Sequence, residues 1–282
     1  MSALQQLPYL LFDIGGTNTR IGYSIDGSTI KDTRIFKTPK TFEEGIVAIA
    51  QTAREMVGEE KPVIAAGGFA GVLSRDKTKI IHSPHLPLWN EKPLAAELSL
   101  AFGTRVFLEN DTALVGLGES FYGAAQNHKI VAYITISTGV NGVRITNNTI
   151  DITHYGFEIG HMIVDFDKSS GKLTLEDLIG GAAIERRYGK APQDIDDPAF
   201  WEEMARLTTI GVTNAVLAWS PEIVVIGGSV LKKLSIERIK MNLKTMLTIY
   251  PEIPTITKAS LGDLGGLWGA LHYLNTKKED AL

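Results

Sequence analysis

The chain has 282 residues, a length that at about 150 residues per domain predicts two domains. Its hydrophobic share of 44% and charged share of 21% are ordinary for a globular protein and exclude wholesale disorder. A formal charge of −4 offers no positive field for nucleic acid or an anionic membrane, so neither is expected as a partner.

Two further features of composition bear on location and chemistry. No apolar run approaches the ~18 residues of a membrane helix, and Met1 to Leu7 lacks the basic start and apolar body of a signal peptide, so a cytoplasmic protein is expected. The absence of cysteine excludes disulfides, thiolate zinc sites and cysteine nucleophiles. The chain has 28 glycines, and many follow apolar runs, where a backbone turn would face a ligand.

The first half of the chain predicts a hairpin followed by alternating helices and strands. Tyr9 to Ile14 is a short apolar run, and the glycine turn after it leads into a second alternating segment. Thr41 and Glu44 form a capping box before a segment with helical apolar spacing. The expected elements are strands at 9–14 and 20–24, a helix at 41–59, a strand at 62–69, a helix at 91–102, a strand at 105–108 and a helix at 112–122.

The second half opens in the same way, so the two halves are expected to share one plan. Ile130 to Ile136 is apolar, a glycine turn follows, and further short strands come after it. The later expected elements are strands within 143–152, helices at 174–188 and 198–219, a strand at 222–226, and helices at 236–249 and 267–274. A boundary near residue 115 predicts a small N-terminal α/β domain at 1–115, completed by 267–282, and a larger C-terminal α/β domain at 116–266.

Two glycine turns are predicted to hold phosphate. Asp13 ends a buried strand, and the Gly-Gly-Thr-Asn turn after it presents successive backbone N–H groups and a hydroxyl to one point, which suits an anion. Asp13 would repel phosphate unless a cation intervened, so its natural role is to hold Mg²⁺, directly or through water. A hairpin turn without a ligand would explain one such motif, but a second turn, Ser137-Thr138-Gly139, repeats it.

A glycine pair at the end of the predicted strand at 222–226 would allow close approach of an adenine or ribose. The chain has neither a P-loop sequence nor a Gly-x-Gly-x-x-Gly within a βαβ unit, so those two nucleotide folds lose support. The predicted cofactor-binding residues are Asp13, Gly15, Gly16, Thr17, Asn18, Ser137, Thr138, Gly139, Gly227 and Gly228.

One carboxylate and two polar groups are candidates for the chemistry. Asp111 falls between a predicted strand and a predicted helix, where its carboxylate can project into a cleft. A carboxylate that accepts the proton of the attacking hydroxyl recurs among phosphoryl-transfer enzymes. Asp is also a favoured helix N-cap, and that alternative stays open. Glu158 and His161 flank a glycine and suit neighbouring hydroxyls of a sugar, although a surface loop would explain them too. Glu176 is a third hydroxyl acceptor, or a first-turn residue favoured by the helix dipole.

Six motifs follow one another along the chain: Asp13-Ile14-Gly15-Gly16-Thr17-Asn18, Glu109-Asn110-Asp111-Thr112-Ala113, Ser137-Thr138-Gly139-Val140-Asn141-Gly142, Glu158-Ile159-Gly160-His161, Leu175-Glu176 and Val225-Ile226-Gly227-Gly228. In this order and spacing they resemble the ROK family, the bacterial glucokinase-like family of sugar kinases, repressors and uncharacterised open reading frames. Segments 68–71 and 86–89 fall where that family has Gly-x-Pro-Gly and Leu-Pro-x-Trp, so the resemblance spans nearly the whole chain.

The resemblance implies an α/β fold of two actin-like (ribonuclease-H-like) ATPase domains, with ATP and sugar in the interdomain cleft, and it implies a homodimer. By position, Asp13 would lie near Mg²⁺, the two glycine turns on the phosphates and the glycine pair beside adenosine. Asp111 would be the catalytic base. The implied substrate-binding residues are Gly71, Asn110, Asp111, Glu158, His161 and Glu176.

The chain departs from the family in two places. The family usually carries a cysteine-rich zinc loop between the His of Glu-x-Gly-His and the downstream Leu-Glu, and this chain has no cysteine there or elsewhere. The interval from His161 to Glu176 is also shorter than usual, as though residues 165–172 closed the gap, so zinc is not expected. Val143 replaces a common glycine, and a β-branched residue would crowd the ATP phosphates unless a strand has already begun there.

The leading hypothesis is an ATP-dependent sugar kinase, in which Asp111 deprotonates a hydroxyl of a hexose or N-acetylhexosamine that attacks the γ-phosphate of Mg·ATP. A catalytically weak or inactive sugar- and nucleotide-binding regulator is the alternative. The twelve residues before Asp13 are too few for a helix-turn-helix domain, which argues against a DNA-binding repressor. An actin-like ATPase without a small-molecule acceptor would leave Asp111 and Glu158 to His161 unexplained. The sugar itself stays open, because epimers differ by one hydroxyl direction.

Overall fold

The computed structural model describes residues 8–58, 62–167 and 171–279, and the chain divides into two compact units. Unit 1 comprises Met1–Phe121, Ile152–Gly156 and Leu261–Leu282, and unit 2 comprises Tyr122–Asp151 and Phe157–Ser260. The first break between the units falls after Phe121, at the end of a helix, a few residues beyond the boundary expected near residue 115. Several sequence expectations lie outside the described residues: the lack of a signal peptide at 1–7, the last expected helical residue Glu59, part of the closing segment at 168–170, and residues 280–282.

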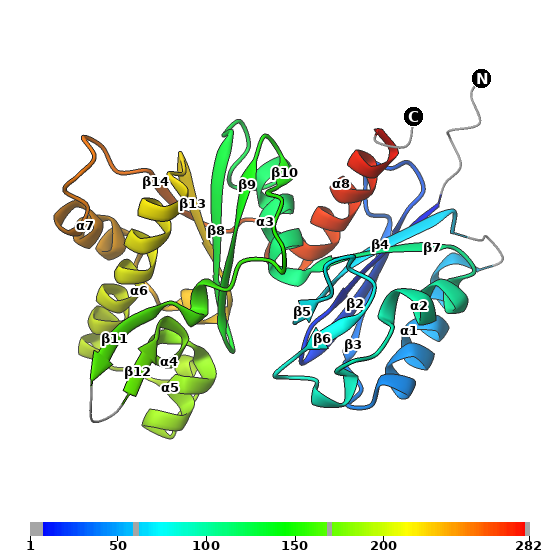
Figure 1. The fold of residues 1–282 in the computed structure, drawn as a ribbon, viewed down its shortest axis with the longest axis horizontal. Coiled ribbons are helices and arrows are strands. Elements are labelled where there is room, and N and C mark those ends of the chain that lie inside the picture. Colours follow the sequence, from blue (N-terminus) through cyan, green and yellow to red (C-terminus); the bar gives the residue numbers. More distant parts are fainter. Residues whose placement is uncertain (1–7, 59–61, 168–170, 280–282) are drawn as a thin grey trace. The chain divides into compact units, whose positions relative to one another are not determined.

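The core of unit 1 is a mixed sheet in the order β3-β2-β1-β4-β7 (Figure 1). β1 pairs antiparallel with β2 and parallel with β4, and β4 pairs parallel with β7. Because β1, β4 and β7 run parallel, their carboxyl ends lie at one edge of the sheet, the edge where α/β proteins bind ligands. The strands are β1 (Tyr9–Ile14), β2 (Asn18–Ser24), β3 (Asp32–Lys37), β4 (Ile64–Phe69) and β7 (Arg105–Asn110).

Alternate residues of β1 face two different helical layers of unit 1. Leu10, Phe12 and Ile14 are fully buried in one hydrophobic core with residues of α1 and α2. Asp13 faces the other layer, where Gly266 at the start of α8 lies so close that a Cβ on it would come 3.0 Å from the Asp13 Cγ. This alternation places a carboxylate at the carboxyl edge of the sheet, beneath α8. The helices are α1 (Phe42–Val57), α2 (Leu94–Phe102), α3 (Asp111–Phe121) and α8 (Gly265–Glu279).

Unit 2 repeats this plan, which confirms that the two halves share one design. Its sheet has the order β10-β9-β8-β13-β14, with β8 antiparallel to β9 and parallel to β13. Val143 lies within β9 opposite Tyr133 and is buried, because β9 has already begun at Val140. The β-branched side chain therefore has ordinary strand geometry. The strands are β8 (Ile130–Ile136), β9 (Val140–Thr146), β10 (Thr149–Ile150), β13 (Ile223–Gly227) and β14 (Thr255–Lys258).

The helices of unit 2 differ from expectation at two points. The single helix expected at 174–188 is two helices, because Gly180 has an extended backbone (ψ 139°) that ends the first one. The helix expected at 236–249 ends at Met246. The helices are α4 (Leu175–Ile179), α5 (Gly181–Tyr188), α6 (Pro198–Trp219) and α7 (Ile236–Met246).

Two short hairpins were not expected from the sequence. Unit 1 contains β5 (Val72–Leu73) paired with β6 (Ile80–His82), and unit 2 contains β11 (Ile163–Asp167) paired with β12 (Gly171–Thr174). Short 3₁₀ turns complete the chain at η1 (Pro87–Trp89), η2 (Ile159–His161), η3 (Pro192–Asp194), η4 (Ser229–Lys232) and η5 (Gly262–Leu264).

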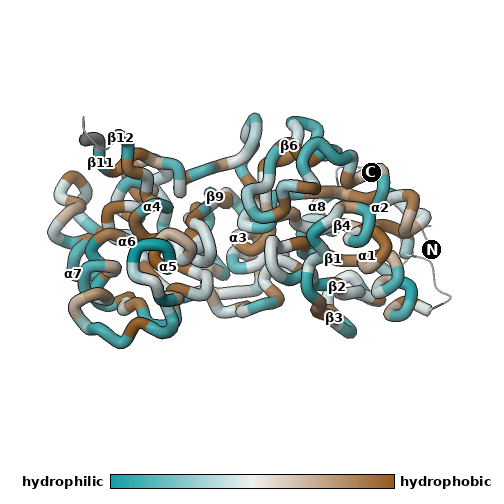
Figure 2. The backbone as a smooth tube through the Cα atoms, turned by 90° about the horizontal axis from the view of Figure 1, so that it is seen from below, coloured by the Kyte–Doolittle hydropathy of each residue, from teal (hydrophilic) through white to brown (hydrophobic). Residues whose placement is uncertain are grey.

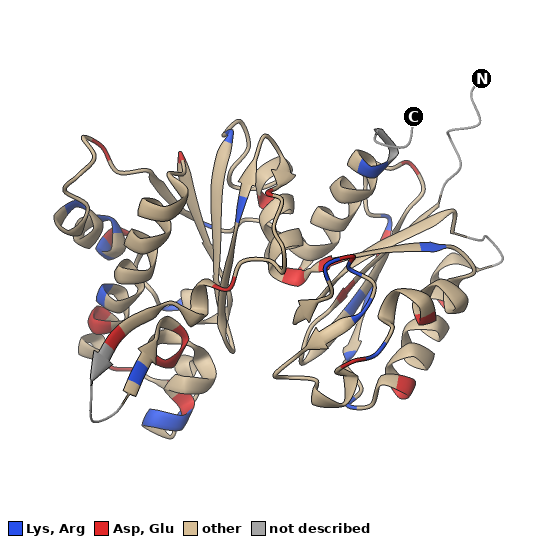
Figure 3. Cartoon of the chain, in the orientation of Figure 1, with Lys and Arg blue, Asp and Glu red and all other residues tan. Residues whose placement is uncertain are grey.

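Hydropathy and charge follow the architecture of each unit. In Figure 2 hydrophobic and hydrophilic stretches alternate along the backbone of both units. Acidic and basic residues are interspersed over both units in Figure 3. Among the described helices, none combines the length and the hydropathy that a bilayer crossing requires.

Candidate functional site

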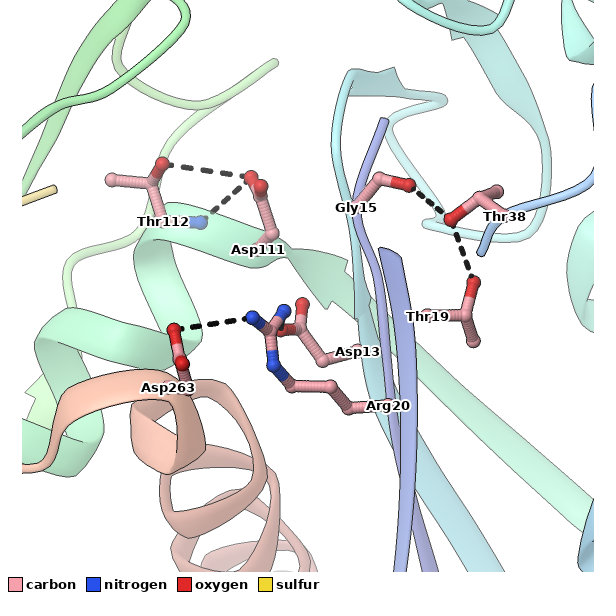
Figure 4. Close-up of polar contacts among 8 residues, drawn as sticks. All are labelled: Asp13, Gly15, Thr19, Arg20, Thr38, Asp111, Thr112 and Asp263. Carbon is pink, nitrogen blue, oxygen red and sulfur yellow. Dashed lines mark hydrogen bonds and ion pairs between the residues drawn. The ribbon is translucent and has the colours of Figure 1, made fainter. Parts of the chain in front are cut away.

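Asp13 and Asp111 lie on either side of one glycine in unit 1. Asp13 is cross-strand partner of Gly68, and a Cβ placed on Gly68 would lie 3.4 Å from the Asp13 Oδ1 and 2.9 Å from the Asp111 Cα. A side chain at position 68 would therefore separate the two acidic residues. Figure 4 shows both carboxylates with Arg20 and Asp263. The sequence predicted one cation-holding and one base carboxylate at these positions, and the fold brings the two together.

The Asp13 carboxylate is buried and has one cationic neighbour in the described part of the site, Arg20. The Arg20 Nη1 lies 3.5 Å from the Asp13 Oδ2, and its Nη2 lies 3.2 Å from the Asp263 Oδ1. Burial raises the pKa of Asp13 from 3.8 to about 6, and the attraction of Arg20 only partly offsets that rise. Because Arg20 compensates the negative charge of this carboxylate only in part, binding of an additional cation would stabilise its ionised form.

The first glycine turn is held by the segment just after β3. The Gly15 N–H donates to the Asn18 carbonyl at 3.1 Å, which closes the turn. The Thr38 Oγ1 donates to the Gly15 carbonyl at 2.7 Å, and the Thr38 N–H donates to the Thr17 carbonyl at 3.0 Å. The carbonyls of the turn are thus engaged within the protein. Gly16 cannot carry a side chain here, because a Cβ would collide with His85.

Asn110 and Asp111 differ in their place at the start of α3: one is the N-cap and the other is the first helical residue. The Asn110 Oδ1 accepts from the Ala113 N–H at 3.1 Å, which makes Asn110 the N-cap of α3. Its Nδ2 donates to the Gly71 carbonyl at 3.3 Å, so Asn110 and Gly71 are in contact as part of one site. Asp111 is the first residue of the helix and accepts from the Thr112 N–H at 2.8 Å. The alternative that Asp111 is the N-cap is therefore wrong.

An ion pair stabilises the segment that carries Asn110 and Asp111. The buried Glu109 carboxylate is paired with Lys77 on the turn between β5 and β6, and its Oε1 accepts from the Asn110 N–H at 2.9 Å. Gly71, whose carbonyl holds Asn110, lies just before the same hairpin. The β5–β6 hairpin is thus fixed to the segment that carries Asn110 and Asp111.

The second glycine turn, between β8 and β9 in unit 2, is tied to the helices that follow Glu176. The N–H groups of Gly181 and Ala182, at the start of α5, donate to the carbonyls of Ser137 and Thr138 at 2.7 and 2.9 Å. The Glu176 Oε2 accepts from the Val140 N–H at 2.8 Å. A Cβ on Gly139 would collide with that same carboxylate. Glu176 therefore contacts the turn that was predicted to bind phosphate.

Glu158, His161 and Glu176 form one electrostatic group in unit 2. Partial burial raises the pKa of Glu158, nearby His161 lowers it, and nearby Glu176 raises it again. The group is joined through the backbone, because Ile163 pairs with Thr174 and the Leu175 N–H donates to the Met162 carbonyl at 2.9 Å. The β11–β12 hairpin thus links the segments that carry His161 and Glu176.

The glycine pair at the end of β13 is explained by packing within the protein. A Cβ on Gly227 would collide with the Tyr133 hydroxyl, and one on Gly228 would collide with the Ile136 carbonyl. Gly228 also has a φ of 96°, which favours glycine. Both glycines are required whether or not a nucleotide approaches them, so their presence alone does not identify an adenosine site.

The donor set of unit 1 fits a magnesium ion bound together with a polyphosphate. Mg²⁺ prefers one or two carboxylates, with phosphate and water oxygens completing its shell. Asp13 supplies such a carboxylate beside a glycine turn. Within the described ranges, no three His, Cys, Asp or Glu side chains converge as an all-protein metal cage would need.

Comparisons with known proteins decide the family. The family model described as "ROK family" matches residues 9–277. This chain belongs to the ROK family. A glucokinase of Thermotoga maritima is 34% identical over 57% of this chain and about half (52%) of its own length. A glucokinase of Streptomyces coelicolor is 26% identical over 92% of this chain and 94% of its own.

A solved structure confirms the fold class. The ROK hexokinase of Thermus thermophilus is 27% identical, covers 96% of this chain and 100% of its own, and has a TM-score of 0.80. The fold is therefore the actin-like, two-domain α/β fold of ROK sugar kinases. Other matching relatives are named fructokinase, N-acetyl-D-glucosamine kinase and xylose repressor, so names within the family differ in sugar and in role.

Sequence reasoning did not single out three residues of this candidate site. Arg20 stands opposite Asp13 in the antiparallel register of β1 and β2, and a basic residue at the start of the second strand was the available signal. Asp263 is 243 residues from Arg20, so no local pattern could join them. Lys77 lies in a turn with a positive φ of 55°, which the sequence did not suggest for a lysine.

Proposed function

We propose that the chain is an ATP-dependent sugar kinase that transfers the γ-phosphate of ATP to a hydroxyl of a hexose or N-acetylhexosamine. The observation that carries the proposal is the position of Asp111. Asp111 is the first residue of α3 and lies across Gly68 from Asp13, and Asn110, not Asp111, caps the helix. Asp111 can therefore act as a base. In phosphoryl transfer to an alcohol the protein mostly positions the reactants and stabilises charge, and it also supplies a base that accepts the hydroxyl proton.

In the proposed reaction, unit 1 supplies the metal carboxylate and the base. Asp13 would hold Mg²⁺. In the turn from Gly15 to Asn18, phosphate oxygens would bind the N–H groups of Gly16 and Thr17 and the Thr17 hydroxyl, while the bond from the Gly15 N–H to the Asn18 carbonyl keeps the turn closed. Mg²⁺, when bound, supplies charge neutralisation at the phosphates. Asn110 would hold a sugar hydroxyl, with its amide oriented by Gly71 and Ala113.

Unit 2 would supply the remaining sugar and nucleotide contacts. Ser137, Thr138 and Gly139 would bind phosphate, and Gly227 and Gly228 would lie beside adenosine. Glu158, His161 and Glu176 would bind neighbouring sugar hydroxyls. Because the Glu176 Oε2 already accepts from Val140, its Oε1 is the oxygen available for a hydroxyl donor.

A coupled ADP-release assay with Mg·ATP tests the proposal. The sugars are glucose, mannose, fructose, allose, N-acetylglucosamine and N-acetylmannosamine, and the matched control is Asp111→Asn. ADP release that depends on one of these sugars, and that is lost in the variant, is expected. ADP release without any sugar would overturn the proposal in favour of an ATPase.

Calorimetric titration of the same sugars and of ATP separates the remaining alternative. The relatives include a protein named xylose repressor, so a sugar-binding regulator is the competing function. Sugar and nucleotide binding without ADP release would favour that regulator over a kinase.

A further inference from the structure

The β5–β6 hairpin is held in unit 1 by contacts outside its own ladder. β5 and β6 form a two-stranded sheet of their own, separate from the five-stranded sheet of the unit (Figure 1). A two-stranded hairpin by itself is marginally stable in water, so its position depends on its neighbours. On β6, the Ile80 N–H donates to the Lys92 carbonyl at 3.0 Å, and the Ile80 carbonyl accepts from the Glu91 N–H at 2.9 Å. Toward β7, two side-chain links complete the attachment.

Both side-chain links lead to Asn110, at the end of β7. Near the base of the hairpin, the Gly71 carbonyl accepts from the Asn110 Nδ2 at 3.3 Å. At its tip, the Lys77 ammonium pairs with the Glu109 Oε2. The Glu109 Oε1 in turn accepts from the Asn110 N–H at 2.9 Å. The hairpin is therefore bound to Asn110 twice, once through the side-chain amide and once through Glu109 to the main chain.

The turn that carries Lys77 holds this lysine in one place. Lys77 has a φ of 55°, a left-handed conformation that is uncommon for residues other than glycine, asparagine and aspartate. Its N–H donates to the Ser74 carbonyl at 2.7 Å, and the Ser74 N–H donates to the Lys79 carbonyl at 2.8 Å. The Asp76 Oδ1 accepts from the Ser74 and Thr78 hydroxyls at 2.6 and 3.0 Å. Because the turn is fixed by these bonds, anchoring the lysine also anchors the hairpin.

The hairpin sets the orientation of the Asn110 amide. The Oδ1 accepts from the Ala113 N–H, and one hydrogen of the Nδ2 goes to the Gly71 carbonyl, which leaves the second Nδ2 hydrogen for a sugar oxygen. A shift of the Gly71 carbonyl would turn the amide and move this donor. Hydrogen bonds weaken steeply as the donor turns away from its acceptor, so a displaced hairpin would weaken the contact with the sugar.

We propose that Lys77 is a positioning residue of the sugar site: its ion pair with Glu109 anchors the β5–β6 hairpin and so directs the Asn110 amide toward the sugar. The inference rests on the proposed function, because Asn110 is a sugar ligand only there. Lys77 itself does not touch the substrate. It acts through Glu109 on the main chain of Asn110 and through the hairpin on its side chain.

Compensation of a buried charge accounts for only part of these contacts. The Glu109 side chain is 7% exposed, and a buried carboxylate requires a cationic partner. That requirement does not explain why the cation lies on the hairpin whose base holds the Asn110 amide. The two accounts differ once Glu109 is made neutral. A lysine that only compensates charge is then dispensable, whereas a lysine that anchors the hairpin is not.

Binding measurements without turnover test the proposal. The probes are glucose, mannose, fructose, allose, N-acetylglucosamine and N-acetylmannosamine, and separately Mg²⁺ with the non-hydrolysable ATP analogue AMPPNP. Each is titrated by calorimetry, well below the melting temperature, into the wild type, Lys77→Met, Lys77→Arg and the double variant Lys77→Met/Glu109→Gln. The matched control is Lys79→Met, because Lys79 lies on the same hairpin and pairs with the exposed Glu91, a contact that contributes little.

The expected result is a loss of sugar affinity alone. Lys77→Met should bind the sugar roughly 3- to 10-fold more weakly, the equivalent of one hydrogen bond, and should bind Mg·AMPPNP within about twofold of the wild type. Lys77→Arg should bind the sugar within about twofold of the wild type, since arginine keeps the ion pair. The double variant should still bind it about threefold more weakly or worse, because the anchor is lost although no buried charge remains. Lys79→Met should match the wild type with both probes.

Several results would overturn the inference. Wild-type sugar affinity in Lys77→Met or in the double variant would mean that the ion pair is only structural. Equal weakening of sugar and Mg·AMPPNP binding in Lys77→Met, or the same loss of sugar affinity in Lys79→Met, would mean a general loosening of the fold. If Lys77→Met does not fold, the double variant carries the same test, because it leaves no uncompensated carboxylate in the interior.

The failure of the proposed function gives a different result. If the wild type binds none of the six sugars, the proposed function fails and this inference fails with it. If the wild type binds one of them and Lys77→Met binds it equally well, only the role of Lys77 is overturned.

Discussion

The Asn110 side chain joins the start of α3 to Gly71: its Oδ1 accepts from the Ala113 N–H at 3.1 Å, and its Nδ2 donates to the Gly71 carbonyl at 3.3 Å. Both ends of the amide are thus engaged, which fixes its orientation. The neighbouring Asp111 does not cap the helix; it is the first residue of α3, and its Cα lies across Gly68 from Asp13. Two adjacent polar residues therefore have separate tasks, one in organising the site and one in the proposed chemistry.

Asn110→Ala should lower the free energy of unfolding by about 1 kcal/mol through loss of the cap. Asn110→Asp should lower it less, because aspartate also accepts from the Ala113 N–H and loses only the bond to Gly71. Urea unfolding of the three proteins, followed by circular dichroism, measures the difference. Equal stability of Asn110→Ala and the wild type would contradict the capping role.

Asp111→Asn should reduce kcat of sugar phosphorylation by about 10² to 10⁴, the usual contribution of a positioned base. The fold should be unchanged, because the amide oxygen can still accept from the Thr112 N–H. Steady-state ADP release gives kcat and the KM values for sugar and ATP. A variant with most of the wild-type kcat would rule out Asp111 as the base.

Magnesium affinity should depend on pH through Asp13. Burial raises the pKa of this carboxyl from 3.8 to about 6 in the metal-free protein. Since the metal needs the ionised form, Mg²⁺ affinity should be constant above about pH 7 and fall about tenfold for each pH unit below 6. Calorimetric Mg²⁺ titrations from pH 5 to 8 measure this.

The metal-free protein should show the opposite trend in stability. A carboxyl with a raised folded pKa binds its proton more tightly when folded, so its unfavourable contribution is absent below about pH 3.8 and grows as pH rises through 6. Asp13→Asn is the control. This variant should bind Mg²⁺ weakly at every pH, and its free energy of unfolding should lack the part of the pH dependence that comes from Asp13. Wild-type Mg²⁺ affinity that stayed flat between pH 5 and 7 would refute this account.

Lys77→Met should destabilise the fold by about 1–3 kcal/mol, because it leaves the buried Glu109 carboxylate without its cationic partner. The Glu109 side chain is 7% exposed and that of Lys77 is 36% exposed, so Glu109→Gln should cost less: the lysine can be solvated. The double variant should recover part of the loss in a double-mutant cycle from chemical unfolding. Strictly additive losses would mean that the pair contributes no coupling.

The sequence predicted those parts of the fold whose signals are local. The repeated strand–glycine turn–strand pattern at Asp13 and Ser137 predicted two similar sheets, and the Thr41 capping box predicted the start of α1. β3 was missed because Asp32–Lys37 is an edge strand of largely polar residues, none of them buried. The helix at 174–188 is split at Gly180, because the N–H groups of Gly181 and Ala182 donate to the Ser137 and Thr138 carbonyls; the Gly180-Gly181 pair was the local signal for this break.

The candidate site was predictable by residue but not by contact. The six motifs supplied Asp13, Asp111 and the unit 2 group, yet spacing could not decide between Asn110 and Asp111 as the cap, since both are favoured cap residues. The pairing of Arg20 with Asp263 depends on α8 packing against the sheet of unit 1. Such long-range contacts are set by tertiary packing, which a single sequence does not display.

The β11–β12 hairpin bears on the resistance of the protein to oxidising and alkylating reagents. Main-chain bonds, among them Leu175 N–H to the Met162 carbonyl, join the segments of His161 and Glu176, and the sequence offers no sulfhydryl anywhere for this task. Peroxide and alkylating reagents therefore find no thiol to modify in that link. The proposed sugar-binding segment, built in this way, should keep its shape under oxidative stress that would break up a thiolate-bound metal loop.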